Sequence, residues 1–157
     1  MNLQPDSMER QEDHSLNEWM RAIRRELHSR PELAYQERHT SGLLSRKLQE
    51  LGIEHHTGVA GTGIVALIEG GEAGKERVSC VALRADMDAI PLQEETGLPF
   101  ASSNPGVMHA CGHDGHMAML LGAAALLKRG PLTGRVKLLF QPAEERGNGA
   151  EKMVGEG

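Results

Sequence analysis

Apolar residues recur every three or four positions in several stretches of the chain, which is the spacing that lines one face of a helix. The first such stretch follows Ser15, which forms a capping-box pattern with Glu18. It should end before Arg30, because Pro31 disfavours helical geometry in the residue before it. Residues 1–14 are polar and acidic and should form a flexible arm. The pattern predicts helices at residues 15–29, 36–51 and 113–129, with a further helix opening at 149–154.

Short apolar runs rich in β-branched residues separate these helical stretches and are typical of buried strands. They predict strands at residues 53–56, 63–68, 78–83 and 136–140. The polar segment 69–77 connects the second run to the third, so these two strands should pair as a hairpin or lie next to each other. Residues 91–106 follow no periodic pattern and should be irregular. Strands separated by apolar helices predict an α/β domain with a buried sheet, mixed or largely parallel.

Composition narrows the functional classes. The 157 residues amount to about one domain, and the formal net charge is −5 at pH 7. A net acidic chain with 3% aromatic residues is a poor candidate for binding nucleic acid through phosphates or base stacking. No apolar stretch reaches the ~18 residues of a transmembrane helix, and the N-terminus lacks a signal-peptide pattern. The two cysteines form no disulfide framework, so a reducing, cytoplasmic setting is expected.

Residues 108–116 concentrate the residue types that bind transition metals. Three of the eight histidines and one of the two cysteines fall here, at the start of the helix predicted over 113–129. Cys111 and His113 are two positions apart, so an extended backbone would point both side chains to one side. A thiolate and an imidazole suit Zn²⁺ or a similar ion. A buried cysteine beside surface histidines would explain any one of these residues, but the whole cluster at a strand-to-helix junction favours a functional site.

Two further polar clusters directly follow predicted strands, where ligands usually bind in open α/β sheets. Residues 84–88 place an arginine and two aspartates on one side of an extended chain, although a solvated ion pair explains them when taken alone. Residues 141–145 end in Glu144 and Glu145, which should point opposite ways on an extended chain. One of them could then bind a metal while the other faces the cavity as a proton carrier. The alternative interpretation is an acidic surface loop, and the cysteine and histidines of residues 108–116 make that interpretation less favoured.

Taken in order, these motifs resemble those of the M20 metallopeptidase family, and within it the aminoacylase-like amidohydrolases. That branch includes hippurate hydrolases, N-acyl-amino-acid amidohydrolases and plant auxin-conjugate hydrolases. The resemblance implies a three-layer αβα sandwich of the zinc-peptidase type with a mixed, largely parallel sheet, of which residues 15–157 would be the N-terminal part. It covers most of the chain after the arm and is carried by the segments at 25–33, 82–89, 108–116 and 141–150.

The resemblance implies a site that holds two divalent transition-metal ions, and Mn²⁺, Zn²⁺, Co²⁺ and Ni²⁺ all suit its ligands. Cys111 would be the thiolate that bridges the two ions, where other branches use an aspartate. His113 would bind one ion and Glu145 the other. Glu144 would be the general base that takes a proton from the attacking water. The implied reaction is hydrolysis of a small N-acyl amino acid to a carboxylate and a free amino acid.

A second part of the implied site lies in residues 84–88. Asp86 would match the catalytic aspartate of the His-x-Asp motif found in other branches. Arg84 stands where their histidine ligand would be and should not bind a metal here.

Members of that family are longer than this chain. In them a second domain interrupts the catalytic domain, carries the dimer interface and helps to enclose the substrate, so a homodimer is expected of a full-length protein. The resemblance also implies further histidine ligands downstream, whereas no histidine follows His116. The chain would then be an incomplete catalytic domain. Two alternatives stay open: a fragment that binds metal without catalysis, and an unrelated thiol chemistry at Cys111.

Overall fold

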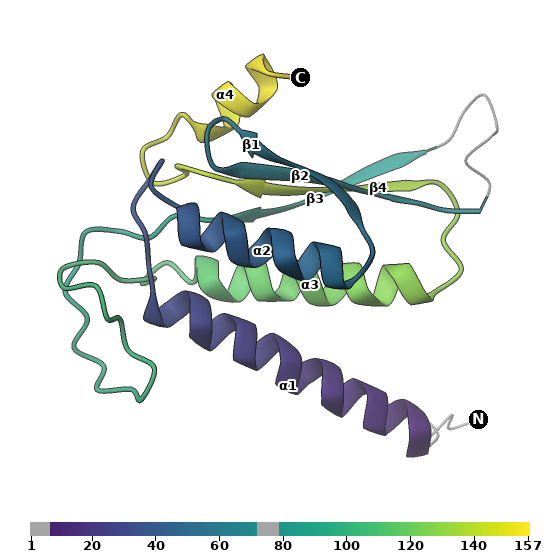
Figure 1. Ribbon diagram of the computed structural model, residues 1–157, viewed down its shortest axis with the longest axis horizontal. Coiled ribbons are helices and arrows are strands. Elements are labelled where there is room, and N and C mark those ends of the chain that lie inside the picture. The colour runs from purple at the N-terminus through teal and green to yellow at the C-terminus, as the bar shows by residue number, and fades with distance from the viewer. Residues whose placement is uncertain (1–6, 72–78) are drawn as a thin grey trace.

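The computed structural model describes residues 7–71 and 79–157 (Figure 1). Its helices are α1 (Ser7–Ser29), α2 (Arg38–Glu50), α3 (His113–Arg129) and α4 (Gly149–Gly155). Its strands are β1 (Glu54–Val59), β2 (Gly63–Glu69), β3 (Cys80–Asp86) and β4 (Arg135–Gln141). Residues 87–112 contain no helix and only isolated strand pairing, which agrees with the irregular segment expected at 91–106.

The described strands form one mixed sheet in the order β1-β2-β4-β3. β2 pairs antiparallel with β1 and with β4, whereas β3 runs parallel to β4. The predicted pairing of the strands at 63–68 and 78–83 is wrong, because β4 lies between β2 and β3. The chain from β3 through α3 to β4 is a crossover unit, which places strands that are distant in sequence side by side. Most of the expected connecting segment, residues 72–78, lies outside the described residues.

One face of the sheet is covered by α2 and α3, and α1 packs on the outer side of α3 (Figure 1). Full burial of one aliphatic side chain contributes about 1.5–3 kcal/mol, so the apolar face of the sheet accounts for the position of these helices. Alternate residues of the two central strands form this buried face: Ile64, Ala66, Ile68, Val136, Leu138 and Phe140.

α4 lies on the opposite side of the sheet, near the end of β4 (Figure 1). Its residues Met153 and Val154 line a hollow together with Val65 and Leu139, which alternate with the buried residues of β2 and β4. Helices therefore flank the mixed sheet on both sides, in agreement with the expected αβα sandwich.

The observed ends of α1 and α2 can be compared with the ends predicted from nearby residues. α1 begins at Ser7, so the start predicted at Ser15 is wrong and residues 7–14 of the expected arm are helical. These residues contain no glycine or proline, and nothing in them stops the helix. α2 ends at Glu50, one residue before its predicted end. Gly52 follows with a φ of 64°, and the N–H groups of Gly52 and Ile53 donate to carbonyls of the last helical turn. None of the described helices is both long and apolar enough to cross a membrane.

Candidate metal centre

The three polar clusters of the sequence meet at one edge of the sheet. β3 and β4 are parallel neighbours whose last residues, Asp86 and Gln141, lie opposite each other. The backbone N–H of Met87 donates to the carbonyl of Gln141, which keeps the two strand exits together. Ile90 and Met108 exchange backbone hydrogen bonds further along the chain. The segment that carries the cysteine and the histidines is therefore brought back beside both strand ends.

Asp88 ties two of these clusters together. Its buried carboxylate accepts the backbone N–H groups of Glu144 and Glu145, each at 3.0 Å. Its backbone carbonyl lies 2.8 Å from Nδ1 of His113. A carbonyl oxygen can only accept a hydrogen bond, so Nδ1 of His113 carries the proton and Nε2 is left to bind a metal.

Nε2 of His113 faces both adjacent glutamates. It lies 4.0 Å from Oε2 of Glu144 and 4.0 Å from Oε1 of Glu145. The expectation that these carboxylates point opposite ways is wrong, because residues 144–147 form a turn and not an extended segment. Bonds from zinc to nitrogen and oxygen are about 2.0–2.2 Å long, so one ion between these atoms can contact the imidazole and a carboxylate. The residues present therefore fit a divalent metal.

The thiol of Cys111 lies against the same glutamates. A hydrogen bond to the carboxylate of Glu145 raises the pKa of this thiol to about 11, with further contributions from desolvation and from the charges of Glu145 and Glu144. Gly112 has a φ of 84°, so the extended backbone expected between Cys111 and His113 is replaced by a left-handed residue that starts α3. Because a thiol binds metal as the thiolate, an ion at Cys111 must displace a proton.

Asp86 and His116 form a second group around His113. One possible ligand atom from each of the three residues lies within 4.8 Å of the other two. Nε and Nη2 of Arg84 contact Oδ1 of Asp86 at 2.9 and 2.8 Å, so the ion pair considered from the sequence is present. Among the described residues, Arg84 belongs to neither group of possible metal ligands.

Known proteins resemble this chain in sequence and in fold. Residues 82–157 match the model of peptidase family M20/M25/M40. Over 145 residues the chain is 48% identical to N-acetyl-L-cysteine deacetylase of Bacillus subtilis (strain 168), a match that covers 91% of this chain and 34% of that protein. Over 139 residues it is 50% identical to IAA-amino acid hydrolase ILR1-like 5 of Arabidopsis thaliana, covering 87% of this chain and 31% of that protein.

Among solved structures, the fold is similar to that of the YXEP protein of Bacillus subtilis, a dinuclear metal-binding peptidase from the M20 family. The two share a TM-score of 0.85 and 43% identity over 91% of this chain and 40% of the other. These matches show that residues 82–157 carry the pattern of peptidase family M20/M25/M40 and that most of the chain is similar to members of that family. The chain spans about a third of the length of the curated relatives it matches.

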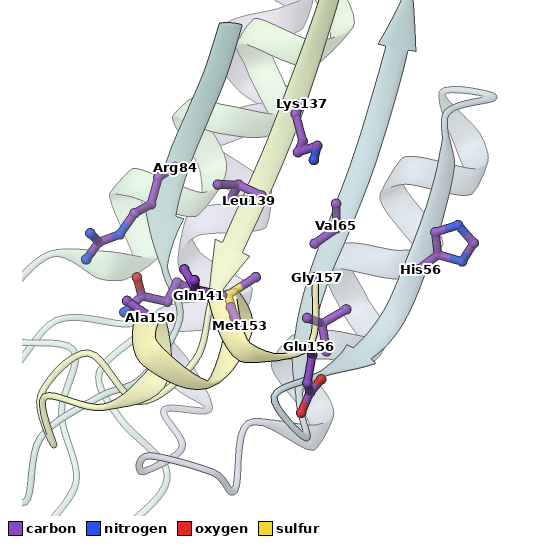
Figure 2. A pocket seen from close by; sticks show the side chains of 12 residues that line it. His56, Val65, Arg84, Lys137, Leu139, Gln141, Ala150, Met153, Glu156 and Gly157 are labelled. Carbon is purple, nitrogen blue, oxygen red and sulfur yellow. The ribbon is translucent and has the colours of Figure 1, made fainter. Parts of the chain in front are cut away.

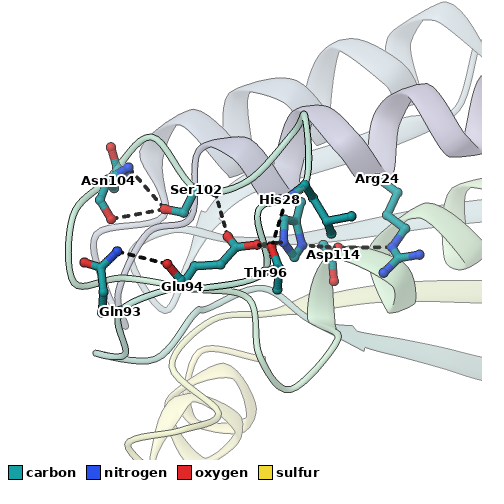
Figure 3. Close-up of polar contacts among 9 residues, drawn as sticks. Arg24, His28, Gln93, Glu94, Thr96, Ser102, Asn104 and Asp114 are labelled. Carbon is teal, nitrogen blue, oxygen red and sulfur yellow. Dashed lines mark hydrogen bonds and ion pairs between the residues drawn. The ribbon is translucent and has the colours of Figure 1, made fainter.

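A polar network connects α1, the irregular segment and the first turn of α3 (Figure 3). Asp114, in the first turn of α3, accepts a hydrogen bond from Nε of Arg24 at 3.1 Å and contacts Nδ1 of His28 at 2.8 Å. Nε2 of His28 lies 3.2 Å from Oε1 of Glu94, whose other oxygen accepts the N–H of Ser102 at 2.6 Å. The network therefore holds α1 and the irregular segment against the helix turn that carries His113, the candidate metal ligand.

His109 is the buried histidine closest in sequence to the predicted ligands. It is 3% exposed, and neither ring nitrogen has a hydrogen-bond partner among the described residues. Burial lowers its pKa to about 4, opposed by the charge of Asp114 and reinforced by His113 and His28. His109 is therefore neutral at pH 7, and it belongs to neither group of possible ligands among the described residues.

The hollow shown in Figure 2 lies beside the candidate metal centre, because Arg84 lines it and also contacts Asp86. Its volume is about 530 Å³, and it lies between α4 and the sheet face that α2 and α3 leave open. None of the predicted metal ligands lines it. Its lining residues from the sheet and from α4 include Val65, Leu139 and Met153.

Asp88 and His116 lie at the site, but the sequence motifs assigned neither of them an individual function. Two signals in the sequence pointed to them: Asp88 is two positions after Asp86, and His116 is about one helical turn after His113. The hydrogen bonds between Asp88 and the backbone of Glu144 and Glu145 could not be predicted from the sequence, because they depend on the tertiary fold.

Proposed function

We propose that this chain supplies metal ligands and the general base for metal-dependent hydrolysis of the amide bond of N-acyl amino acids. The observation that carries the proposal is the convergence of two glutamates on Nε2 of His113, at 4.0 Å each, with the Cys111 thiol bonded to one of them. The similarity to an N-acetyl-L-cysteine deacetylase and an IAA-amino acid hydrolase supports this class of reaction.

Cys111, His113 and Glu145 are the proposed metal ligands, with Cys111 as the bridge between two ions. Thiolate, imidazole and carboxylate together suit Zn²⁺, Mn²⁺, Co²⁺ or Ni²⁺. The similarity to a dinuclear metal-binding peptidase supports a site for two such ions. When bound, divalent ions lower the pKa of water and polarise the scissile carbonyl.

Glu144 is the proposed general base. Its side chain is 40% exposed, against 28% for Glu145, so it is the more accessible of the two to a substrate. It would take a proton from the attacking water and deliver it to the amine nitrogen as the C–N bond breaks. Asp86, held by Arg84 and within reach of His113, is the proposed catalytic aspartate.

The proposed substrate is a small molecule, and the proposed setting is the reducing cytoplasm. The free thiols of Cys80 and Cys111 support that setting. The homodimer expected of a longer protein stays a prediction.

The test measures bound metal and amine release from hippurate and N-acetyl amino acids in the presence of each of the four ions. The wild-type chain should bind metal and release amine, Glu144→Ala should bind metal without releasing amine, and Cys111→Ala should lose metal. Glu151→Ala, at an exposed position of α4, is the matched control and should behave as wild type.

Full hydrolysis by Glu144→Ala would overturn the assignment of the base. Metal binding without amine release by the wild-type chain would favour the alternative of a metal-binding module. The observation that favours this alternative is that the chain covers only 34% and 31% of two relatives.

A further inference from the structure

Glu37 is a fully buried glutamate outside the proposed ligand set. It stands at the N-cap of α2, and its side chain leaves the helix to contact two other parts of the fold. Oε2 accepts a hydrogen bond from the hydroxyl of Thr62, in the turn between β1 and β2, at 2.7 Å. Oε1 accepts the backbone N–H of Ala143 at 3.0 Å. Glu37 therefore links α2 and the β1–β2 turn to the loop that follows β4.

Two buried carboxylates together hold three successive N–H groups of that loop. Glu37 accepts from Ala143, and Asp88 accepts from Glu144 and Glu145. Both acids are at most 1% exposed and reach the loop from distant parts of the chain. Hydrogen bonds to a carboxylate are stronger than bonds between neutral groups, and a buried N–H without a partner is costly. The loop is therefore fixed residue by residue.

Ala143 needs such support because of its backbone conformation. Its φ of 53° lies in the left-handed region that residues with a Cβ atom rarely occupy, and its side chain is fully buried. This residue turns the chain so that both following glutamates face His113. A relaxed, extended Ala143 would swing the turn at residues 144–147 as a unit and carry both carboxylates away from Nε2 of His113.

We propose that Glu37 is a positioning residue for the metal centre, which holds Ala143 in the left-handed conformation that brings Glu144 and Glu145 together at His113. This inference rests on the proposed function, in which those two glutamates bind metal and move the proton. Partners that orient a metal ligand commonly change affinity by 10–100-fold when removed. Glu37→Ala should accordingly weaken metal binding by about 10–100-fold without removing any ligand.

The control is Glu32, a glutamate that precedes α2 and whose carboxylate caps the first turn of that helix. Its carboxylate accepts the N–H groups of His39 and Thr40 at 3.0 and 2.9 Å and forms no hydrogen bond with the loop after β4 among the described residues. Glu32→Ala should destabilise the start of α2 while leaving the loop in place. Comparing the two variants at matched global stability separates positioning from a general structural role.

Two measurements are made on the full 157-residue chain. Amide hydrogen exchange of residues 143–145, followed by NMR without metal, reports on the loop itself. A Co²⁺ titration reports on the ligands. Glu37→Ala should accelerate exchange at these three amides and weaken Co²⁺ binding, whereas Glu32→Ala should change neither beyond its effect on global stability.

Glu37→Gln covers the case in which Glu37→Ala does not fold. The amide keeps an oxygen for the N–H of Ala143 but loses the charge, so exchange at Ala143 should rise by about fivefold. Exchange at residues 143–145 that is unchanged in the folded Glu37 variants, or accelerated equally in Glu32→Ala, would overturn the inference. Absence of Co²⁺ binding in the wild-type chain would instead count against the proposed function, and the exchange data would still decide the role of Glu37.

Discussion

Metal binding at Cys111 should release one proton, because the thiol is protonated until an ion displaces the proton. With its pKa raised to about 11, roughly one molecule in 10⁴ carries the thiolate at pH 7, and each further pH unit raises that fraction tenfold. Between pH 7.5 and 9, carboxylates and imidazoles generally carry no bound proton, so the thiol supplies the one that is lost. The apparent Co²⁺ affinity should therefore rise about tenfold per pH unit.

The assay is a Co²⁺ titration at several pH values, followed by the absorption of the cobalt–thiolate bond. Calorimetry in buffers of different ionisation enthalpy counts the released proton independently. Cys111→Asp is the matched control, because a carboxylate binds metal without losing a proton in this range. Its affinity should be nearly independent of pH. A wild-type affinity that does not change with pH, or an equal slope in Cys111→Asp, would refute the reasoning.

The same pKa bears on the alternative of thiol chemistry at Cys111. A thiol that is almost entirely protonated reacts slowly with alkylating reagents, because the thiolate is the nucleophile. Glu145 contributes the largest part of the shift through its hydrogen bond, so Glu145→Gln should speed alkylation of Cys111. Fast alkylation of the wild-type chain at pH 7 would instead favour a reactive thiol.

Three further predictions concern stability. Lowering the pH of the metal-free chain from 6.5 to 4 should reduce the free energy of unfolding by about 3 kcal/mol through His109. Over this range the imidazole of His109 gains a proton in the unfolded chain. The buried ring of the folded chain does not, because its pKa is lowered to about 4. Urea titrations should show this loss in the wild type but not in His109→Phe, and equal losses would contradict it. Gly52→Ala should lower the free energy of unfolding by roughly 1–2 kcal/mol, because Gly52 has a φ of 64°. Thermal unfolding measures this loss, and Gly71→Ala, at an exposed position, should show a smaller one. Leu138→Ala, at a fully buried position, should lower the free energy of unfolding by about 2–5 kcal/mol in urea titrations. Val154→Ala, at a position 82% exposed, should change it by no more than about 0.5 kcal/mol. Similar losses in both variants would contradict the described core.

The local elements of the fold could be predicted because their signals are local. α3 has the predicted bounds, since an apolar run is enclosed between Gly112 and Gly130. The place of β4 between β2 and β3 could not be predicted in this way. An apolar run shows that a strand is buried on its faces, but it carries no information about which strand lies beside it.

The candidate metal centre was predictable in its residue types and less so in its geometry. The structure brings His113 and Glu145 together and places the Cys111 thiol at Glu145, but Cys111 belongs to neither group of possible metal ligands among the described residues. The convergence of the Glu-Glu pair depends on a left-handed Ala143, and a residue other than glycine gives no warning of that conformation. It also depends on two buried carboxylates from distant parts of the chain, which only the tertiary structure brings to the loop.

The central claim is that Cys111, His113 and Glu145 bind the same metal centre, and X-ray absorption of the Zn²⁺-loaded chain tests it most directly. The predicted spectrum contains one sulfur at about 2.3 Å and nitrogen and oxygen ligands at about 2.0–2.2 Å. In Cys111→Asp the sulfur contribution should disappear while the lighter ligands remain. A wild-type spectrum without sulfur, or one whose sulfur contribution survives in Cys111→Asp, would contradict the account.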